Sequence, residues 1–348
     1  MLQKGESVRV VAIKLLFSFI FSFLVSCYLI PFLCRLAVKI GAIDLPDGKI
    51  KLHEKATPSL GGIAVYWGFI SALALTCPFE SSFNFLIIGI TFLLFLGFVD
   101  DLITLAPYQK FFGQFIAALC FIKGGFHLKA VFFHSFFNVA FSAFWILLVI
   151  NAFNLIDVMD GLVAITATSA AFSFFVLAVI FKQWAIAIIL ASFIGGVFGF
   201  FVYNRPPAKI YLGDAGSLFI GGFFAAVPFF FHWGEFQPLG FFAPAIILGI
   251  PILEVATLVV IRTYKGIPFY IGSHDHFSQY LQRKGWRKMR VLLYVLLLSL
   301  VEGAVALLFV LNLISFGVVV FSGGMFLLIW FLVLCFARTV ATKNKKQN

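Results

Sequence analysis

Every third position of one short segment carries an amide or an acid: Asn151, Asn154, Asp157 and Asp160. Residues three apart lie on nearly the same face of a helix, so this spacing predicts a polar stripe. The apolar run 137–153 runs into this segment, and polar side chains at membrane depth are costly unless they are hydrated, paired or bound to a cation. The stripe therefore predicts a hydrated or cation-binding site. A polar face used only for helix packing is the plainer alternative.

Two adjacent acids, Asp100 and Asp101, end the apolar run 83–99. Neighbouring carboxylates at a membrane boundary repel each other and resist burial, so the pair indicates a cation, a proton relay or water. A solvated pair of loop acids is the alternative.

A third acid, Asp214, lies between glycines in the string LGDAGS at 212–217. Glycine permits a close approach of the backbone to a phosphate or a metal, and the helix expected to follow favours anions at its N-terminus. The same string also fits an ordinary helix cap by Asp214 or Ser217.

Two basic loops supply cations. The string HEKATPSLGG at 53–62 contains His53 and Lys55, which could balance the charge of a phosphate or a pyrophosphate. The string HDHFSQYLQRKGW at 274–286 combines histidines with several cations. For this second string, metal binding, anion binding and simple solvation all remain open.

The candidate ligands in these clusters are hard oxygen atoms, with no cysteine and few histidines. Such donors suit Mg²⁺ or Mn²⁺ rather than zinc. Because Mg²⁺ commonly joins one or two protein groups to substrate phosphates, the combination indicates phosphoryl transfer.

Membrane helices must position these residues. Of the 348 residues, 62% are hydrophobic and 11% are charged, whereas soluble chains carry about 25% charged residues. Spanning a bilayer takes about 20 apolar residues, and the candidate runs cover 10–31, 60–77, 83–99, 111–123, 137–153, 161–181, 184–203, 217–232, 240–261, 290–312 and 314–337. We therefore expect an all-α polytopic membrane protein of about 11 spans and one domain, 1–348. Its first run is expected to be a span ended by Pro31, not a cleaved signal peptide.

The basic residues predict which way these spans are oriented. With eleven spans, 19 of the 25 lysines and arginines fall in the loops and tail on one side. By the positive-inside rule this side is cytoplasmic, together with the C-terminus. All the acidic clusters lie on the same side. The net charge of +11 is thus explained by topology and by anionic lipid headgroups, and we expect no nucleic-acid partner.

These clusters, in this order, resemble the polyprenyl-phosphate N-acetylhexosamine-1-phosphate transferase family. The matching strings are HEKATPSLGG at 53–62, GFVDDL at 97–102, NAFNLIDVMDGL at 151–162, GDAGS at 213–217 and, more weakly, HDHFSQYLQRKGW at 274–286. The resemblance covers about residues 40–290, and the stripe of amides and acids is its most specific element.

The resemblance implies about ten or eleven transmembrane helices around a cytoplasmic-facing cleft, in the bacterial inner membrane and often in a homodimer. The implied reaction joins undecaprenyl phosphate to the sugar phosphate of a UDP-N-acetylhexosamine and releases UMP. The implied cofactor is Mg²⁺, with Mn²⁺ as a substitute.

The resemblance also implies roles for single residues. Asn154 and Asp214 would hold Mg²⁺. The implied catalytic residues are Asp100, Asp101, Asp157 and Asp160, of which Asp100 would deprotonate or orient the lipid phosphate. The implied substrate contacts are His53, Lys55, Lys110, Asn151, Leu212, Gly213, Ser217, His274, His276 and Arg283.

Two members of the family differ in the last large loop. Phospho-MurNAc-pentapeptide transferases typically have three consecutive histidines there, whereas this chain has Asp275 between two histidines. The spacing of the following residues is similar to that of GlcNAc-1-phosphate transferases, so we expect a GlcNAc-type donor. Gln279 and Tyr280 depart from that pattern, because many such enzymes have histidine and arginine at these positions.

Two other classes of protein would share many of these features. A secondary transporter also has many spans and buried acids, but transporters tend to place charge near the bilayer midplane on broken helices. Here the acids gather at one membrane boundary, which favours an enzyme. A non-catalytic scaffold is the second alternative, and the presence of all the matching acids argues against it.

Overall fold

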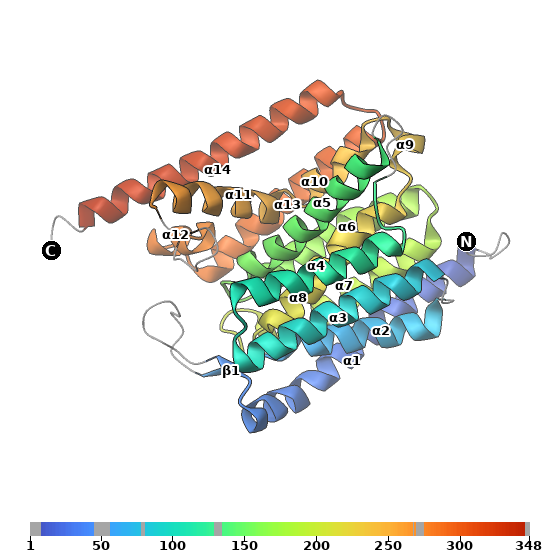
Figure 1. Cartoon of the computed structure of the whole chain (residues 1–348), viewed down its shortest axis with the longest axis horizontal. Coiled ribbons are helices and arrows are strands. Elements are labelled where there is room, and N and C mark those ends of the chain that lie inside the picture. The colour runs from blue at the N-terminus through green and yellow to red at the C-terminus, as the bar shows by residue number, and fades with distance from the viewer. Residues whose placement is uncertain are drawn as a thin grey trace. The chain divides into compact units, whose positions relative to one another are not determined.

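The computed structural model describes residues 8–44, 56–77, 81–128, 134–266, 268 and 275–344, without the side chains of 81, 82 and 332–344. Three expected substrate contacts, His53, Lys55 and His274, lie outside the described residues. The chain divides into two compact units, Met1–Phe231 and His232–Asn348, and each is described by itself. Both are built from helices (Figure 1).

Eight α-helices make up the described part of the first unit. They are α1 (Val8–Ile40), α2 (Gly61–Thr76), α3 (Ser81–Ile103), α4 (Pro107–Lys123), α5 (Ser135–Ile156), α6 (Leu162–Ile180), α7 (Trp184–Asn204) and α8 (Gly213–Ala226). A short 3₁₀ helix, η1 (Val227–Phe230), follows α8. The strands β1 (Ile43–Asp44) and β2 (Thr57–Pro58) form one antiparallel pair.

Helix α8 is the buried centre of this unit. Every residue from 215 to 226 is buried, and α8 packs against α2, α3 and α5. The outer helices instead leave large apolar side chains such as Leu24, Phe95 and Phe144 exposed. Helices that are apolar on all sides are typical of proteins in a bilayer.

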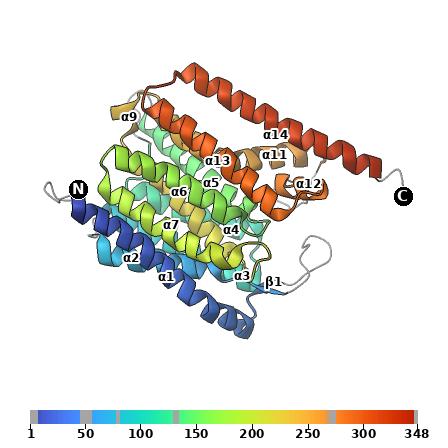
Figure 2. The same cartoon turned by 180° about the vertical axis from the view of Figure 1, so that it is seen from behind.

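Small residues bring α1 and α7 together, and the two helices lie side by side (Figure 2). A Cβ atom at Gly195 would clash with the carbonyl oxygen of Phe19, and one at Gly199 would lie 2.6 Å from that of Phe23. Close backbone approach through small residues is the usual way in which membrane helices pack.

The second unit contains α9 (Trp233–Phe236), η2 (Gly240–Phe242), α10 (Ala243–Ile247), α11 (Gly249–Tyr264), α12 (Phe277–Arg283), α13 (Lys288–Val310) and α14 (Phe316–Asn344). Residues 240–247 and 249–264 form an apolar pair of segments bent by 72°. A side chain at Gly249 would clash with the carboxylate of Glu302 on α13. Glycine at the break therefore lets α13 pack against the bend.

The helices confirm an all-α, multi-pass membrane protein. In the described part of the chain, seven helices are long and apolar enough to cross a bilayer, or eight if the bent pair is one span. Each of the eleven runs expected from the sequence overlaps a helix.

The expected end of the first span at Pro31 is wrong. Pro31 lies inside α1, which continues to Ile40. Membrane helices tolerate proline where other groups bind the backbone carbonyls that it leaves unpaired. Pro31 lacks the N–H group that would pair with the carbonyl oxygen of Cys27, so α1 loses one backbone hydrogen bond here and still continues as a helix.

The expected helical stripe is also wrong in its second half. Helix α5 ends at Ile156, and Asp157 has the non-helical angles φ −78° and ψ 60°. Gly161 has a φ of +77°, which suits glycine and turns the chain into α6. Asn151 and Asn154 therefore lie on a helix, whereas Asp157 and Asp160 lie in the turn that follows it.

Candidate active site

The corner between α3 and α4 holds Asp100 beside Lys110. One carboxylate oxygen of Asp100 accepts a hydrogen bond from the backbone nitrogen of Leu105 over 2.6 Å, and the other lies 2.8 Å from Nζ of Lys110. Pro107 occupies the first turn of α4 and Gln109 accepts a bond from the backbone of Ala106. The start of α4 is thus fixed so that Lys110 faces the end of α3.

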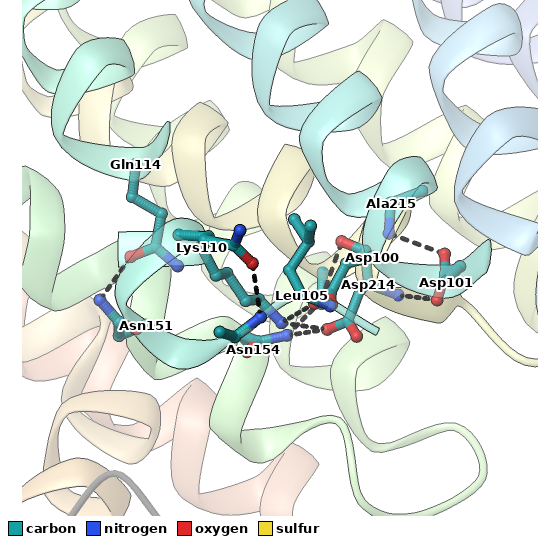
Figure 3. A network of polar contacts seen from close by, with 12 residues as sticks. Asp100, Asp101, Leu105, Lys110, Gln114, Asn151, Asn154, Asp214 and Ala215 are labelled. Carbon is teal, nitrogen blue, oxygen red and sulfur yellow. Dashed lines mark hydrogen bonds and ion pairs between the residues drawn. The ribbon is translucent and has the colours of Figure 1, made fainter. Parts of the chain in front are cut away.

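Lys110 also contacts the acid at the start of α8. Its Nζ atom lies 2.7 Å from Oδ1 of Asp214, so one ammonium group joins two carboxylates from different helices (Figure 3). Separations of this size are charge-assisted hydrogen bonds. Asp100, Lys110 and Asp214, which come from three different helices, therefore lie together in the structure.

Asp101 turns the other way and caps α8. Its two carboxylate oxygens accept hydrogen bonds from the backbone nitrogens of Asp214, over 2.8 Å, and Ala215, over 3.0 Å (Figure 3). A carboxylate is favoured here, because these amides have no partner within the helix and carry a partial positive charge. Asp101 thus fixes the backbone that carries Asp214.

Glycines allow α3 and α8 to come this close. Gly213 has a φ of +77°, and a Cβ atom there would lie 2.7 Å from Oδ2 of Asp101. A Cβ atom at Gly97 would clash with the backbone of Asp214. Gly213 thus leaves room for the carboxylate of Asp101, and Gly97 lets α3 approach the backbone of Asp214.

Asn154 completes the network from α5. Its Nδ2 atom donates to Oδ1 of Asp214, and to Oγ of Ser217 over 2.9 Å. Ser217 in turn donates to the backbone carbonyl of Asp214 over 3.3 Å. The two residues expected to hold a metal, Asn154 and Asp214, are therefore in direct contact.

Asn151 has a different environment one turn earlier. Its Nδ2 atom donates to Oε1 of the buried Gln114 over 2.7 Å and to the carbonyl oxygen of Leu147 over 2.8 Å (Figure 3). These bonds join α5 to α4. The hydrogen bond to Gln114 therefore accounts for the partial burial of the Asn151 amide, and no contact with a substrate is needed to explain it.

Asp157 is the acid whose carboxylate accepts no hydrogen bond from any described residue. Burial raises its pKa well above the usual range, and the negative charges of Asp214, Asp101 and Asp44 raise it further, while Lys110 opposes them. Three negative charges thus act on this carboxyl group against the positive charge of Lys110, and a cation would be attracted there.

Asp160 and Asn204 shape the neighbouring loop. Asp160 accepts a hydrogen bond from the backbone nitrogen of Ala208 over 3.2 Å. Asn204 accepts one from the backbone of Gly161 and donates one to the carbonyl oxygen of Ile210, both over 2.8 Å. Sequence analysis missed Asn204, for which the only signal was an amide at the end of the apolar run 184–203.

The loop after Asn204 leads into α8 along the start of α2. The carbonyl oxygens of Tyr211 and Leu212 accept hydrogen bonds from the backbone nitrogens of Gly61 and Gly62, over 2.9 and 2.8 Å. The side chain of Leu212 is buried. Leu212 and Gly213, both expected to contact substrate, therefore already position α8 through their backbones.

The donor atoms fit a magnesium ion that is held partly by substrate. Within the described residues, no group of three or more His, Cys, Asp or Glu side chains could hold a metal ion by itself. Asp214, Asn154 and Asp157 supply hard oxygen atoms near one another, and Mg²⁺ typically takes only one or two carboxylates and completes its shell with phosphate and water.

The second unit contains the remaining expected contacts, His276 and Arg283. Nδ1 of His276 lies 2.9 Å from Oε1 of the buried Glu254 on α11, which sequence analysis missed because Glu254 stands alone in an apolar run. The guanidinium carbon of Arg283 lies 4.9 Å above the ring of Tyr280. The Tyr280 hydroxyl donates to Asp275 over 2.7 Å. This network orders the start of α12.

Comparisons with known proteins agree with the motifs. A model of glycosyl transferase family 4 matches residues 83–232. The chain is 29% identical over 301 residues to a probable undecaprenyl-phosphate N-acetylglucosaminyl 1-phosphate transferase of Bacillus subtilis (strain 168), covering 82% of each protein. It is 34% identical over 247 residues to a phospho-N-acetylmuramoyl-pentapeptide-transferase of Geobacillus thermodenitrificans (strain NG80-2), covering 63% of this chain and 74% of the relative. A transferase of the same name from Bacillus thuringiensis (strain Al Hakam) is 30% identical over 306 residues, or 79% of this chain and 90% of the relative.

Proposed function

Because the chain belongs to glycosyl transferase family 4, we propose that it transfers N-acetylglucosamine-1-phosphate from UDP-N-acetylglucosamine to undecaprenyl phosphate. The product is a lipid-linked pyrophosphoryl sugar, and UMP is released. The observation that carries this proposal is the network in which Asp100, Lys110, Asn154 and Asp214 meet from four different helices. This network supports the proposal because the phosphates of two substrates need a cation and oxygen ligands for a metal close to one another.

The reaction forms one phosphorus–oxygen bond and breaks another. An oxygen of the lipid phosphate attacks the sugar-bearing phosphorus, and the oxygen that bridges the two phosphates leaves with UMP. Both reactants are anions, so catalysis depends mainly on positioning and on neutralising charge. A covalent aspartyl phosphate on the way is the alternative.

The residues divide this work. Asn154 and Asp214 would hold Mg²⁺, with Asp157 beside them; when bound, Mg²⁺ would neutralise charge on the pyrophosphate. Lys110 binds phosphate oxygens, and Asp100 orients the lipid phosphate and accepts its proton. Asp101 acts as a positioning residue, because both of its oxygens hold the start of α8.

The donor sugar is proposed from the last large loop and the relatives. Asp275 stands between the two histidines and is held by Lys265 and Tyr280, so it is already engaged within the protein. The aspartate between the two histidines, together with the relative named as an N-acetylglucosaminyl 1-phosphate transferase, supports a GlcNAc-type donor. The relatives named as phospho-N-acetylmuramoyl-pentapeptide-transferases make UDP-MurNAc-pentapeptide the second candidate.

We also propose the arrangement in the membrane. The eleven apolar runs cross the bacterial inner membrane and enclose a cleft that opens to the cytoplasm, with the C-terminus on the same side. The distribution of lysine and arginine supports this orientation. The protein would act as a homodimer, as members of the family often do.

Supplying the purified protein with undecaprenyl phosphate and Mg²⁺, together with UDP-GlcNAc, UDP-GalNAc or UDP-MurNAc-pentapeptide in separate reactions, tests the function. We expect a lipid product with the mass of the GlcNAc adduct, together with UMP. If only UDP-MurNAc-pentapeptide gave a lipid product, it would be the donor in place of UDP-GlcNAc. Uptake of a solute into vesicles with no lipid product from any donor would reject the enzyme in favour of a transporter. Chelation by EDTA should stop turnover and added Mg²⁺ should restore it.

A further inference from the structure

One oxygen atom in the candidate site accepts hydrogen bonds from two donors, one of which is an ammonium group. Oδ1 of Asp214 accepts a bond from Nζ of Lys110 and a second bond from Nδ2 of Asn154. Both donors thus contact an oxygen atom that is a metal ligand in the proposed function. An N–H group and a metal ion cannot occupy the same lone pair of a carboxylate oxygen.

We infer that Lys110 is a resident counter-ion of Asp214, which a divalent cation must displace and which then moves to the substrate phosphates. The inference rests on the proposed function for the identity of the phosphates. It concerns the order of events at Asp214, which the family resemblance does not assign.

Accessibility supports an exchange at Asp214 rather than at Asp100. The side chain of Asp214 is 34% exposed, whereas that of Asp100 is 7% exposed. An incoming cation can therefore reach Asp214 first. The four-carbon stem of lysine is flexible and its ammonium group has no fixed binding direction, so Lys110 can leave Asp214 without moving α4.

The charges in the site also support the order in which Lys110 contacts Asp214 before a metal binds. Among the described residues, the four acids Asp100, Asp101, Asp157 and Asp214 lie around the ammonium group of Lys110, and the charges of Asp101 and Asp214 both act on Asp157. In a site that is partly shielded from water, leaving these acids without a cation would be costly. Lys110 supplies that cation before the metal arrives.

The exchange couples two parts of the site. Because Lys110 contacts both Asp214 and Asp100, its movement to a phosphate would also release an oxygen of Asp100. The donor nucleotide gives the displaced ammonium a new partner, so metal and nucleotide should each strengthen the binding of the other. Asn154 would have to turn its amide so that Oδ1, in place of Nδ2, faces the ion.

The test measures Mn²⁺ binding to the nucleotide-free protein by electron paramagnetic resonance. We expect Lys110→Met to bind Mn²⁺ about tenfold more tightly than the wild type, because the competing charge is gone. Lys110→Arg keeps the charge and should show no such gain. The matched control is Lys123→Met, which removes an exposed lysine at the far end of the same helix and should leave the affinity unchanged.

A second measurement adds UDP. It should strengthen Mn²⁺ binding more in the wild type than in Lys110→Met, since only the wild type has an ammonium group to transfer to the phosphates. Equal or weaker Mn²⁺ binding by folded Lys110→Met, an equal gain in Lys110→Arg, or no Mn²⁺ binding by any variant would overturn the inference. A wild type that shows the exchange but makes no lipid product would reject the proposed function and leave the exchange intact.

Discussion

The Oδ1 atom of Asp101 lies 2.8 Å from the backbone nitrogen of Asp214, so the second acid of the DD pair holds the main chain of the acid that the reaction is proposed to use. Asp100, its neighbour, instead faces Lys110. Two adjacent carboxylates thus have different partners, because consecutive residues of a helix point in directions about 100° apart. Their substitution should have different consequences.

Replacing Asp101 by asparagine should destabilise the protein and weaken metal binding at the proposed site. The amide keeps one acceptor but turns an N–H group toward a backbone N–H group, and it removes a negative charge from the start of α8. We expect a loss of about 1–2 kcal/mol in stability, as for other helix caps, and a higher Mg²⁺ concentration for half-maximal turnover. Thermal unfolding and a Mg²⁺ titration measure the two effects. Unchanged stability and Mg²⁺ dependence would contradict the capping role.

Replacing Asp100 by asparagine should spare the fold and remove the reaction. The amide oxygen can still accept the bond from the backbone of Leu105, so the melting temperature should stay near that of the wild type. We expect UMP release to fall by at least about 10²-fold, which is the usual size of a lost proton acceptor. Asp101→Asn is the internal comparison, since excess Mg²⁺ should restore it and should leave Asp100→Asn inactive. Normal UMP release by Asp100→Asn would exclude the proposed role.

Sequence patterns predicted the helices better than their ends. Apolar runs located the spans because the bilayer demands about 20 apolar residues for each one. The end of α5 at Ile156 was not predictable from spacing, because the turn at Gly161 depends on a hydrogen bond that its backbone nitrogen donates to Asn204, which lies 43 residues further along the chain. As a result, Asp157 leaves the face that carries Asn154, although both remain near Asp214.

The sequence also predicted which acids belong to the candidate site, but not which partner each acid has. The motifs placed Asp100, Asp101 and Asp214 on one side of the membrane, and the structure brings them together. Whether an acid faces a lysine or a helix end depends on tertiary packing, which residue types do not encode locally. Glu254 was missed for the same reason, since its partner His276 is 22 residues away.

Replacing Gly213 by alanine should misplace α8. The residue has a φ of +77°, and a Cβ atom would meet the carbonyl oxygen of Ser59 and the carboxylate of Asp101. Strain and clash together should cost more than about 1–2 kcal/mol, with loss of turnover. The control is Gly323→Ala on α14, where a Cβ atom meets nothing within 4 Å and alanine favours the helix. Equal stability of Gly213→Ala and the wild type would show that the turn adapts.

The metal-free protein should lose stability as the pH rises, and Asp157 should account for part of that loss. Burial first, and then the charges of Asp214, Asp101 and Asp44, raise the pKa of its carboxyl group in the folded state, whereas the unfolded chain has an ordinary value of about 3.9. At pH values between these two pKa values, the folded state therefore binds more protons than the unfolded state. The stability that protonated Asp157 contributes is fully present below the ordinary pKa, and it is lost as the pH rises through the raised pKa of the folded state.

Asp157→Asn resembles the protonated acid at every pH, so it should remove this loss. In EDTA we expect the variant to melt at a higher temperature than the wild type at about pH 8, and at nearly the same temperature at about pH 3, which lies below the ordinary pKa of the acid. Added Mg²⁺ should narrow the difference at the higher pH, because a cation offsets the charge that the variant lacks. A variant that melts below the wild type at about pH 8 without metal would mean that the ionised Asp157 stabilises the fold. The surplus of negative charge around Asp214, on which the metal proposal depends, would then have to be compensated within the protein.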